Sequence, residues 1–193
     1  MMNQDVLLER WIPYKLQAVE TLQFAWEWIN ETNEVRDLHI IVNGQLKLRG
    51  NVATVANPMI EVGLIHARSL LEFLGLCVQN GKLAQIKKRR PDDVAVEDFS
   101  TSQYPLTKVD PYTILAAYPG PTQEAEDALI AIFELANKGL AHITKENFSK
   151  LWTDQHLDIA CRGIPVLLHN RLYAKLGRNI PKAPEAISKL FDA

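Results

Sequence analysis

The stretch PMIEVGLIHARSLLEFLGLCV, residues 58–78, decides the fold, because it is apolar around most of its circumference when it is wound as a helix. A helix of this kind must be surrounded by other elements, so we expect it to be the central helix of a bundle. It is predicted to run from about Pro58 to Val78 and to stop at Asn80-Gly81, a good C-terminal signal. Its apolar residues are Met59, Ile60, Val62, Leu64, Ile65, Leu70, Leu71, Phe73, Leu74 and Leu76.

Apolar residues recur at three- and four-residue steps elsewhere in the chain, which is typical of helices with one buried face. Pro13 suits a first helical position, and Gly139 and Gly177 can take the left-handed conformation that ends a helix. Pro165 is expected to kink the last helix. The sequence therefore predicts a single all-α domain over 1–193. Its other helices are expected over 13–30, 121–139, 144–152 and 154–176.

Residues 39–48, HIIVNGQLKL, interrupt the helical pattern with two short β-prone runs joined by Asn43-Gly44. This dipeptide between two such runs is the strongest short-range hairpin signal. A two-stranded hairpin alone is marginally stable, so we expect it to lie against the helices. We interpret it as an excursion from the helical bundle.

Regular periodicity is lost over 82–120, which predicts an irregular arm. Its basic run, Lys87-Lys88-Arg89-Arg90, could contact phosphates. However, no aromatic residues are interleaved and Asp92-Asp93 follow closely, so a solvated loop is the favoured interpretation. Four prolines punctuate the rest of the arm, and one short helix is expected at about Pro111 to Ala117.

The composition is that of an ordinary globular protein: 193 residues, 47% hydrophobic, 23% charged, with a formal net charge of −2. Such a balance gives no global attraction to nucleic acid or membrane. Cys77 and Cys161 lie in apolar helical contexts without metal-ligand spacing, so we expect buried free thiols, no metal and no cofactor. The start of the chain lacks a signal-peptide pattern, and the longest apolar stretch is broken by charges. A cytoplasmic protein that does not enter a membrane is the simplest expectation.

Three charged residues of the central helix, Glu61, Arg68 and Glu72, share one stripe, at i, i+7 and i+11. A central helix should carry an arginine only where its charge is paired or meets a ligand. One interpretation is a ladder of ion pairs, with Glu72 one turn ahead of Arg68 and Glu61 two turns behind. The other is that Arg68 reaches out of the bundle toward His142 to bind an anion, helped by His66.

The segment NKGLAHIT, residues 137–144, follows an acidic amphipathic helix and concentrates several reactive side chains. His142 could act as an acid or base near neutral pH. Asn137 and Lys138 could hold a phosphate or a carboxylate. The alternative is structural: His142 packs beside Ile143 and donates to a helix carbonyl.

Arg162 and His169 form a weaker candidate pair, two turns apart on the last helix, because Pro165 disturbs their alignment. The sequence contains no Gly-rich phosphate loop, no GxSxG and no HExxH. These absences argue against the enzyme classes that depend on those motifs.

The segments ARSLLEFL (residues 67–74) and NKGLAHIT (residues 137–144), taken in this order, resemble a bacterial branch of the HEPN superfamily. The resemblance implies an all-helical fold, a homodimer and, in many members, metal-independent ribonuclease activity. The superfamily signature is an arginine followed after four to six residues by a histidine. His142 matches that histidine and Lys138 takes a polar position, but Asn137 stands where the arginine should be.

The missing arginine favours a HEPN-like helical module with a degenerate nuclease motif, which binds RNA, a nucleotide or a protein partner. The alternative is a metal-independent ribonuclease. In that scheme the histidine assists attack by the 2′-hydroxyl, and a basic residue such as Arg68 or Lys138 holds the scissile phosphate. The candidate catalytic residues are His142 and Arg68, and the candidate ligand-binding residues are Asn137, Lys138, Glu72 and His66.

Overall fold

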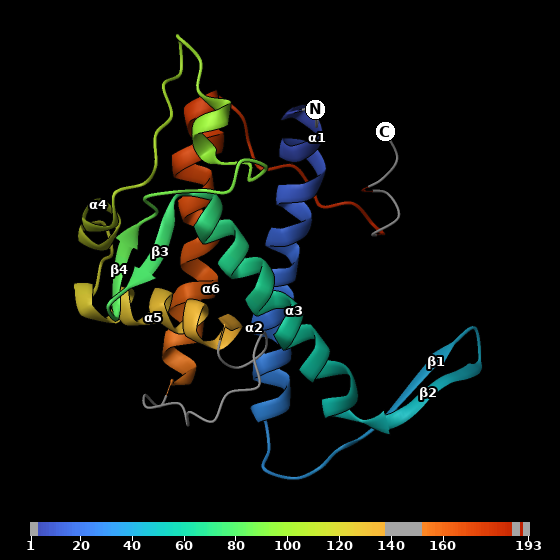
Figure 1. Ribbon diagram of the computed structural model, residues 1–193. Coiled ribbons are helices and arrows are strands. Elements are labelled where there is room, and N and C mark those ends of the chain that lie inside the picture. Colours follow the sequence, from blue (N-terminus) through green and yellow to red (C-terminus); the bar gives the residue numbers. More distant parts are fainter. Residues whose placement is uncertain (1–3, 138–151, 187–189, 191–193) are drawn as a thin grey trace.

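The computed structural model describes residues 4–137, 152–186 and 190, and shows a mostly helical body with two antiparallel β-hairpins (Figure 1). The prediction of an all-α bundle of four main helices with one hairpin is confirmed only in its mostly helical character, because a second hairpin is present. The strands are β1 (Asp37–Val42), β2 (Gln45–Asn51), β3 (Leu76–Gln79) and β4 (Lys82–Gln85). The helical segments are α1 (Gln4–Val6), η1 (Leu7–Trp11), α2 (Ile12–Asn30), α3 (Val52–Phe73), η2 (Val96–Phe99), α4 (Pro111–Ala116), α5 (Thr122–Glu134), α6 (Asp154–Leu168), η4 (His169–Tyr173) and η5 (Ala174–Leu176).

The first helix starts earlier than predicted, because α1, η1 and α2 follow one another without a break from Gln4 to Asn30. Pro13 thus lies inside a helical run. A proline lacks the N–H that would bond one turn back, and its ring crowds the preceding turn. The wider π-helical turn over Leu7–Trp11, closed by the Ile12 N–H donating to the Leu7 carbonyl, lies directly before the proline and accommodates this defect.

Helix α3 packs mainly against α2 and is not enclosed on all sides, since Val62 is 44% exposed and Ile65 50% exposed, so the prediction of a surrounded central helix is corrected. Its limits also differ from the predicted ones at both ends. It begins at Val52, where the Asn51 side chain accepts a hydrogen bond of 3.1 Å from the Thr54 N–H and caps the first turn. Pro58 therefore lies inside the helix. The helix ends at Phe73, and Gly75 follows with a φ of +96°, a conformation that favours glycine.

The dipeptide Asn80-Gly81 is the turn of a second hairpin and not a helix end, so this prediction is wrong. Asn80 and Gly81 have φ angles of +52° and +73°, as a two-residue hairpin turn requires. β3 and β4 pair in antiparallel register from Leu76 opposite Gln85 to Gln79 opposite Lys82. The turn reverses the chain and brings the basic run back beside the C-terminal end of α3.

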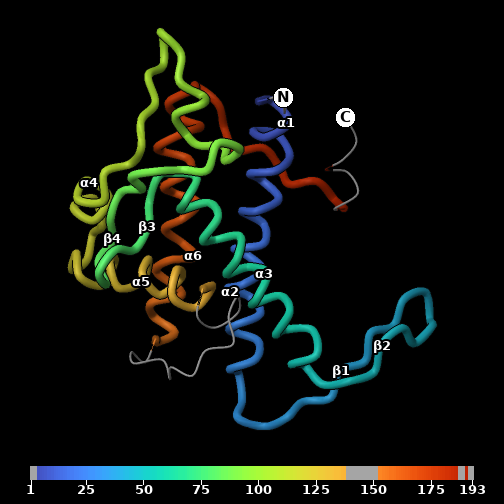
Figure 2. The backbone as a smooth tube through the Cα atoms, in the orientation of Figure 1, coloured from blue at the N-terminus to red at the C-terminus, as the bar shows by residue number. Residues whose placement is uncertain are grey.

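The predicted hairpin around Asn43-Gly44 is present as β1 and β2, but it does not lie against the helices. It projects from the body, attached at its base, where the Val52 N–H donates to the Arg36 carbonyl at 2.9 Å (Figures 1 and 2). Near its tip Ile41 is 63% exposed and Leu46 57% exposed. The expected packing of this hairpin on the bundle is therefore wrong.

The arm over 82–120 is less irregular than predicted, because it contains β4, η2 and α4. Two backbone hydrogen bonds fasten it to the end of α3: the Ile86 N–H donates to Gly75 at 2.8 Å, and the Val109 N–H donates to Leu74 at 2.9 Å. The expected short helix is present as α4. The buried apolar side chains of the arm are Leu83, Ala95, Val96, Phe99, Leu106, Val109 and Ile114.

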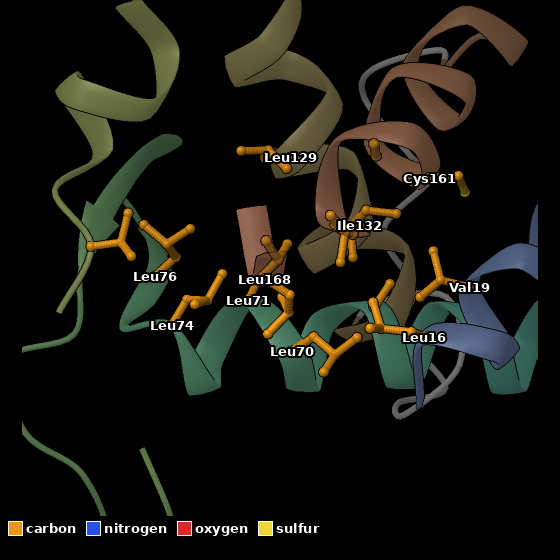
Figure 3. Packing of buried hydrophobic residues seen from close by; sticks show 14 of the residues in the cluster. Leu16, Val19, Leu70, Leu71, Leu74, Leu76, Leu129, Ile132, Cys161 and Leu168 are labelled. Atoms are coloured by element: carbon orange, nitrogen blue, oxygen red, sulfur yellow. The ribbon is translucent and has the colours of Figure 1, made fainter. Parts of the chain in front are cut away.

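The core forms where α3 meets α2, α5 and α6, and Leu16, Leu70, Ile132 and Leu168 lie close together there (Figure 3). The helical run that begins with α6 ends at Gly177, which has a φ of +66°, as predicted. The predicted end of the third helix at Gly139 and the short helix over 144–152 fall outside the described residues. Within the described part, no helix is both long and apolar enough to cross a membrane.

Gly63 allows α2 and α3 to pack closely. A Cβ at this position would overlap Leu22 Cβ and lie 2.8 Å from the Ala18 carbonyl oxygen.

We expect Gly63→Ala to destabilise the fold by about 1–3 kcal/mol through overpacking, despite alanine's better helix propensity. Gly163→Ala, a change in α6 where a Cβ meets nothing within 4 Å, is the matched control. It should be neutral or stabilising by up to about 1 kcal/mol. Urea unfolding tests both, and equal effects would contradict close packing at Gly63.

Candidate functional site

Arg68 connects the segment 67–74 of α3 with Asn137, the first residue of the segment 137–144. Its Nε donates to Glu72 Oε1 at 2.9 Å, so the predicted ion pair with Glu72 is present, one turn along α3. Its Nη1 donates to the side-chain oxygen of Asn137, which follows α5. Glu61 is exposed and does not join the pair. The Arg68 side chain is 31% exposed, and its guanidinium is held in place by one carboxylate and one amide.

A pocket of about 870 Å³ opens beside this ion pair, and we call it the Arg68 pocket. One wall is the C-terminal part of α3 and the strand β3, and the other is the segment that follows β4. The basic run therefore faces the Arg68 stripe, an arrangement that the sequence did not predict. The lining consists of Arg68, Ser69, Glu72, Phe73, Cys77, Val78, Gln79, Ile86, Lys87, Lys88, Arg89, Arg90, Asp92, Asp93 and Val94.

Arg89 is a structural member of the basic run, which corrects the interpretation of the run as a solvated loop. Its two terminal nitrogens donate to the carbonyls of Glu72 at 2.7 Å and Phe73 at 3.2 Å, and one also pairs with Glu97 at 3.3 Å. Carbonyls at a helix C-terminus carry partial negative charge and lack helical partners. Arg89 therefore caps α3, and its side chain is only 14% exposed.

The other three cations of the basic run are accessible to a ligand. Lys87, Lys88 and Arg90 are exposed, and within the described part of the chain no ion pair engages them. Two acids, Asp92 and Asp93, share the lining, and Asp93 accepts a hydrogen bond of 3.1 Å from the Arg90 N–H. Arg68 and Arg89 have their own carboxylate partners, so the remaining charges are three cations and the two acids, a net charge of +1.

His66, predicted beside Arg68, does not line this pocket. It faces α2, where the Tyr14 ring meets it edge-on at 5.6 Å and its Nδ1 lies 3.2 Å from Lys15 Nζ. Burial, followed by the neighbouring Lys15 charge, lowers the pKa of His66 to about 4. The physical reason for the separation is helical geometry, since positions two apart point in different directions.

The other candidates are placed as follows. His142 and Lys138 lie outside the described residues, and of the 137–144 segment only Asn137 is described. Arg162 pairs with Asp158 at 2.7 Å and has no contact with His169 among the described residues. The pair with Asp158 accounts for the charge of Arg162 without a ligand.

The described residues contain no cluster of acids, histidines and cysteines that could hold a metal ion. Both cysteines are free thiols; Cys161 is buried and Cys77 half-buried in the pocket wall. Burial and the charge of Glu72 raise the pKa of the Cys77 thiol. The thiolate is the nucleophilic form, so Cys77 is poorly suited to nucleophilic chemistry at neutral pH.

Comparison of the chain with protein-family models, curated proteins and solved structures found no match. The site is therefore interpreted from its own chemistry: a guanidinium held by two partners, exposed cations on an irregular segment, and an opening large enough for a ligand.

Arg89→Gln should destabilise the protein by about 1.5–3 kcal/mol, because it removes the charged hydrogen bonds to the Glu72 and Phe73 carbonyls and the ion pair with Glu97, and among the described residues only the Glu72 carbonyl keeps another partner, the Gly75 N–H. Lys88→Gln, one residue away and exposed, should stay within about 0.5 kcal/mol. Urea unfolding of the two variants measures the difference. A cost for Lys88→Gln as large as for Arg89→Gln would show that Arg89 is not a cap.

His66 should make stability depend on pH. Its pKa is about 6.5 when unfolded and about 4 when folded, so between these values the unfolded chain binds a proton that the folded chain does not. The contribution of His66 to the free energy of unfolding is therefore fully present above about pH 6.5 and is lost as the pH falls toward 4. His66→Gln should lose less stability than wild type between about pH 7 and pH 5 in urea titrations. His39→Gln, on the exposed hairpin, should keep the wild-type dependence, and an unchanged dependence in His66→Gln would contradict this assignment.

Proposed function

We propose that this chain is a HEPN-like helical module that binds RNA through the Arg68 pocket and carries a degenerate nuclease motif. The observation that carries the proposal is the hydrogen bond from Arg68 to Asn137 beside a pocket that also collects the basic run. It supports the resemblance because two segments 69 residues apart, chosen from sequence motifs, are in contact.

The cations of the pocket favour a polyanionic ligand. Lys87, Lys88 and Arg90 lie within four residues of one another on a segment without regular secondary structure and line the same pocket, so they can contact neighbouring phosphates of a strand. Neutralising backbone phosphates releases counterions and supplies sequence-independent affinity. Phe73 is the only aromatic among the described lining residues, and it already packs against Phe99 at 5.8 Å. The site is therefore suited to phosphate contacts and less to base stacking.

Binding is favoured over catalysis by the state of Arg68. Two of its three nitrogens are engaged by Glu72 and Asn137. In the superfamily scheme an arginine at the Asn137 position would hold the scissile phosphate. Here that position supplies a neutral amide, which orients Arg68 but adds no charge to stabilise a pentacovalent phosphate.

Binding can be measured by the fluorescence anisotropy of a labelled single-stranded RNA at several salt concentrations. We expect the double variant Lys87→Gln/Lys88→Gln to bind more weakly. It should also reduce the slope of log affinity against log salt by about 0.7 for each phosphate that the variant no longer neutralises. The matched control is Lys47→Gln/Arg49→Gln, which removes the same charge from the exposed hairpin.

The control variant should bind RNA like wild type. Competition with a mononucleotide distinguishes the ligand class: a polyanion site prefers the RNA strand, whereas equal competition by the mononucleotide would replace RNA by a nucleotide in this proposal. No binding at low salt, or an equal loss of affinity in the hairpin variant, would refute the Arg68 pocket as an RNA site.

The alternative function is a metal-independent ribonuclease that uses His142 with Arg68, Asn137 and Lys138, in a site formed across a symmetric homodimer. The contact between Arg68 and Asn137 favours it in part, because it joins two of the four residues. Purified protein incubated with total RNA and a chelator tests it. Cleavage that His142→Ala abolishes would establish the enzyme and overturn the binding-only proposal, and intact RNA in both samples would support binding alone.

A further inference from the structure

A second opening, of about 710 Å³, lies between α4, α5 and α6, apart from the Arg68 pocket; the two share no lining residue. We call it the α6 groove. Its volume falls within the range of about 300–1,000 Å³ that is typical of small-molecule sites. Its apolar lining comprises Ile114, Leu115, Ala117, Tyr118, Pro119, Ala125, Leu129, Ile159, Gly163, Val166 and Leu167.

Gly163 leaves open space on the face of α6 that lines the groove. Ile159, Gly163, Val166 and Leu167 follow one another at three- and four-residue steps, so they share one face of α6. A Cβ added at Gly163 would meet nothing within 4 Å, and Val166 beside it is 55% exposed. This face of α6 is therefore apolar, and at Gly163 it carries no side chain that would fill the groove.

Charge is unequal at the two ends of the groove. Toward the start of α6, Arg162 is neutralised by Asp158, which also accepts a hydrogen bond of 3.0 Å from Gln23. Toward the end of the helical run, Arg171 and Lys175 lie one turn apart, and no ion pair engages them within the described residues. The charge of Arg171 also acts on the nearby Asp110 carboxylate, which partly offsets it. An occupant therefore meets apolar side chains of α6 and, at one end, a net positive charge from Arg171 and Lys175.

We propose that the α6 groove binds a straight-chain fatty carboxylate, with the acyl chain over Gly163 and the carboxylate at Arg171 and Lys175. An acyl chain has no polar atoms along its length, so the apolar middle of the groove leaves nothing unpaired. A peptide would place backbone amides there, and each amide without a partner would weaken binding. The cationic end complements the carboxylate.

The probes are octanoate, decanoate and dodecanoate at monomeric concentrations, titrated into the full chain by calorimetry. Each added CH₂ should tighten the Kd by about fourfold, as expected for a methylene removed from water. Decanol, which has no charge, should bind more weakly than decanoate. A Kd that is independent of chain length overturns the acyl site, and equal binding of decanol and decanoate overturns the role of the cations.

Variants at Gly163 test whether the acyl chain of the ligand lies over this residue. Gly163→Leu should abolish decanoate binding by filling the groove, and Gly163→Ala should weaken it less, because the methyl group occupies a smaller volume. Circular dichroism confirms folding, and the alanine variant keeps the test valid if the leucine variant does not fold. Decanoate binding by a folded Gly163→Leu protein as tight as in wild type would refute this location.

Two lysine variants test whether the carboxylate of the ligand binds at Lys175. Lys175→Gln should weaken decanoate binding and leave decanol binding unchanged, whereas Lys182→Gln, at an exposed lysine that does not line the groove, should alter neither. Equal effects of the two lysine variants would overturn the placement of the carboxylate. Because the α6 groove and the Arg68 pocket have no residue in common, failure of one proposal leaves the other standing.

Discussion

The close approach of α2 and α3 at Gly63 is the constraint on which the rest of the structure depends. With no Cβ at Gly63, the backbone of α3 lies against Leu22 and the Ala18 carbonyl, and the apolar faces of both helices are buried together. This contact sets where α3 runs, and the C-terminal half of α3 then packs through Leu70 and Leu71 against buried residues of α5 and α6 such as Ile132 and Leu168 (Figure 3). The direction of α3 in turn determines which stripe of the helix reaches the pocket, and so where Arg68 lies.

The C-terminal end of α3 is where fold and candidate site are joined. Gly75 turns the chain, and a Cβ at that position would lie 2.8 Å from Lys108 Cβ, so the close return of the arm again depends on a glycine. The hairpin of β3 and β4 then directs the basic run to the helix end, where Arg89 caps the last carbonyls. One arginine of the run is thus committed to the fold, and its neighbours stay free.

The sequence predicted the elements better than their connections. The dipeptide Asn-Gly was interpreted correctly at residues 43–44, where β-prone runs flank it, and wrongly at 80–81. The preceding residues LEFLGLCV continue the apolar pattern of the helix, and a short apolar run does not distinguish a helix from a buried strand. At the site, the Arg68–Glu72 pair follows from local spacing. The contact with Asn137 and the cap by Arg89 join distant segments, so no local pattern revealed them.

The sequence by itself determined that Asn43-Gly44 turns a hairpin, that Gly177 ends the last helical run, and that Arg68 needs a partner. These are properties of helical periodicity, backbone conformation and the cost of burying a charge, which act within a few residues. Only the tertiary structure decided that the first hairpin projects, that His66 faces Lys15, and that the basic run meets the Arg68 stripe. These outcomes depend on how helices cross and where turns return the chain, because packing between distant segments has no counterpart in local sequence.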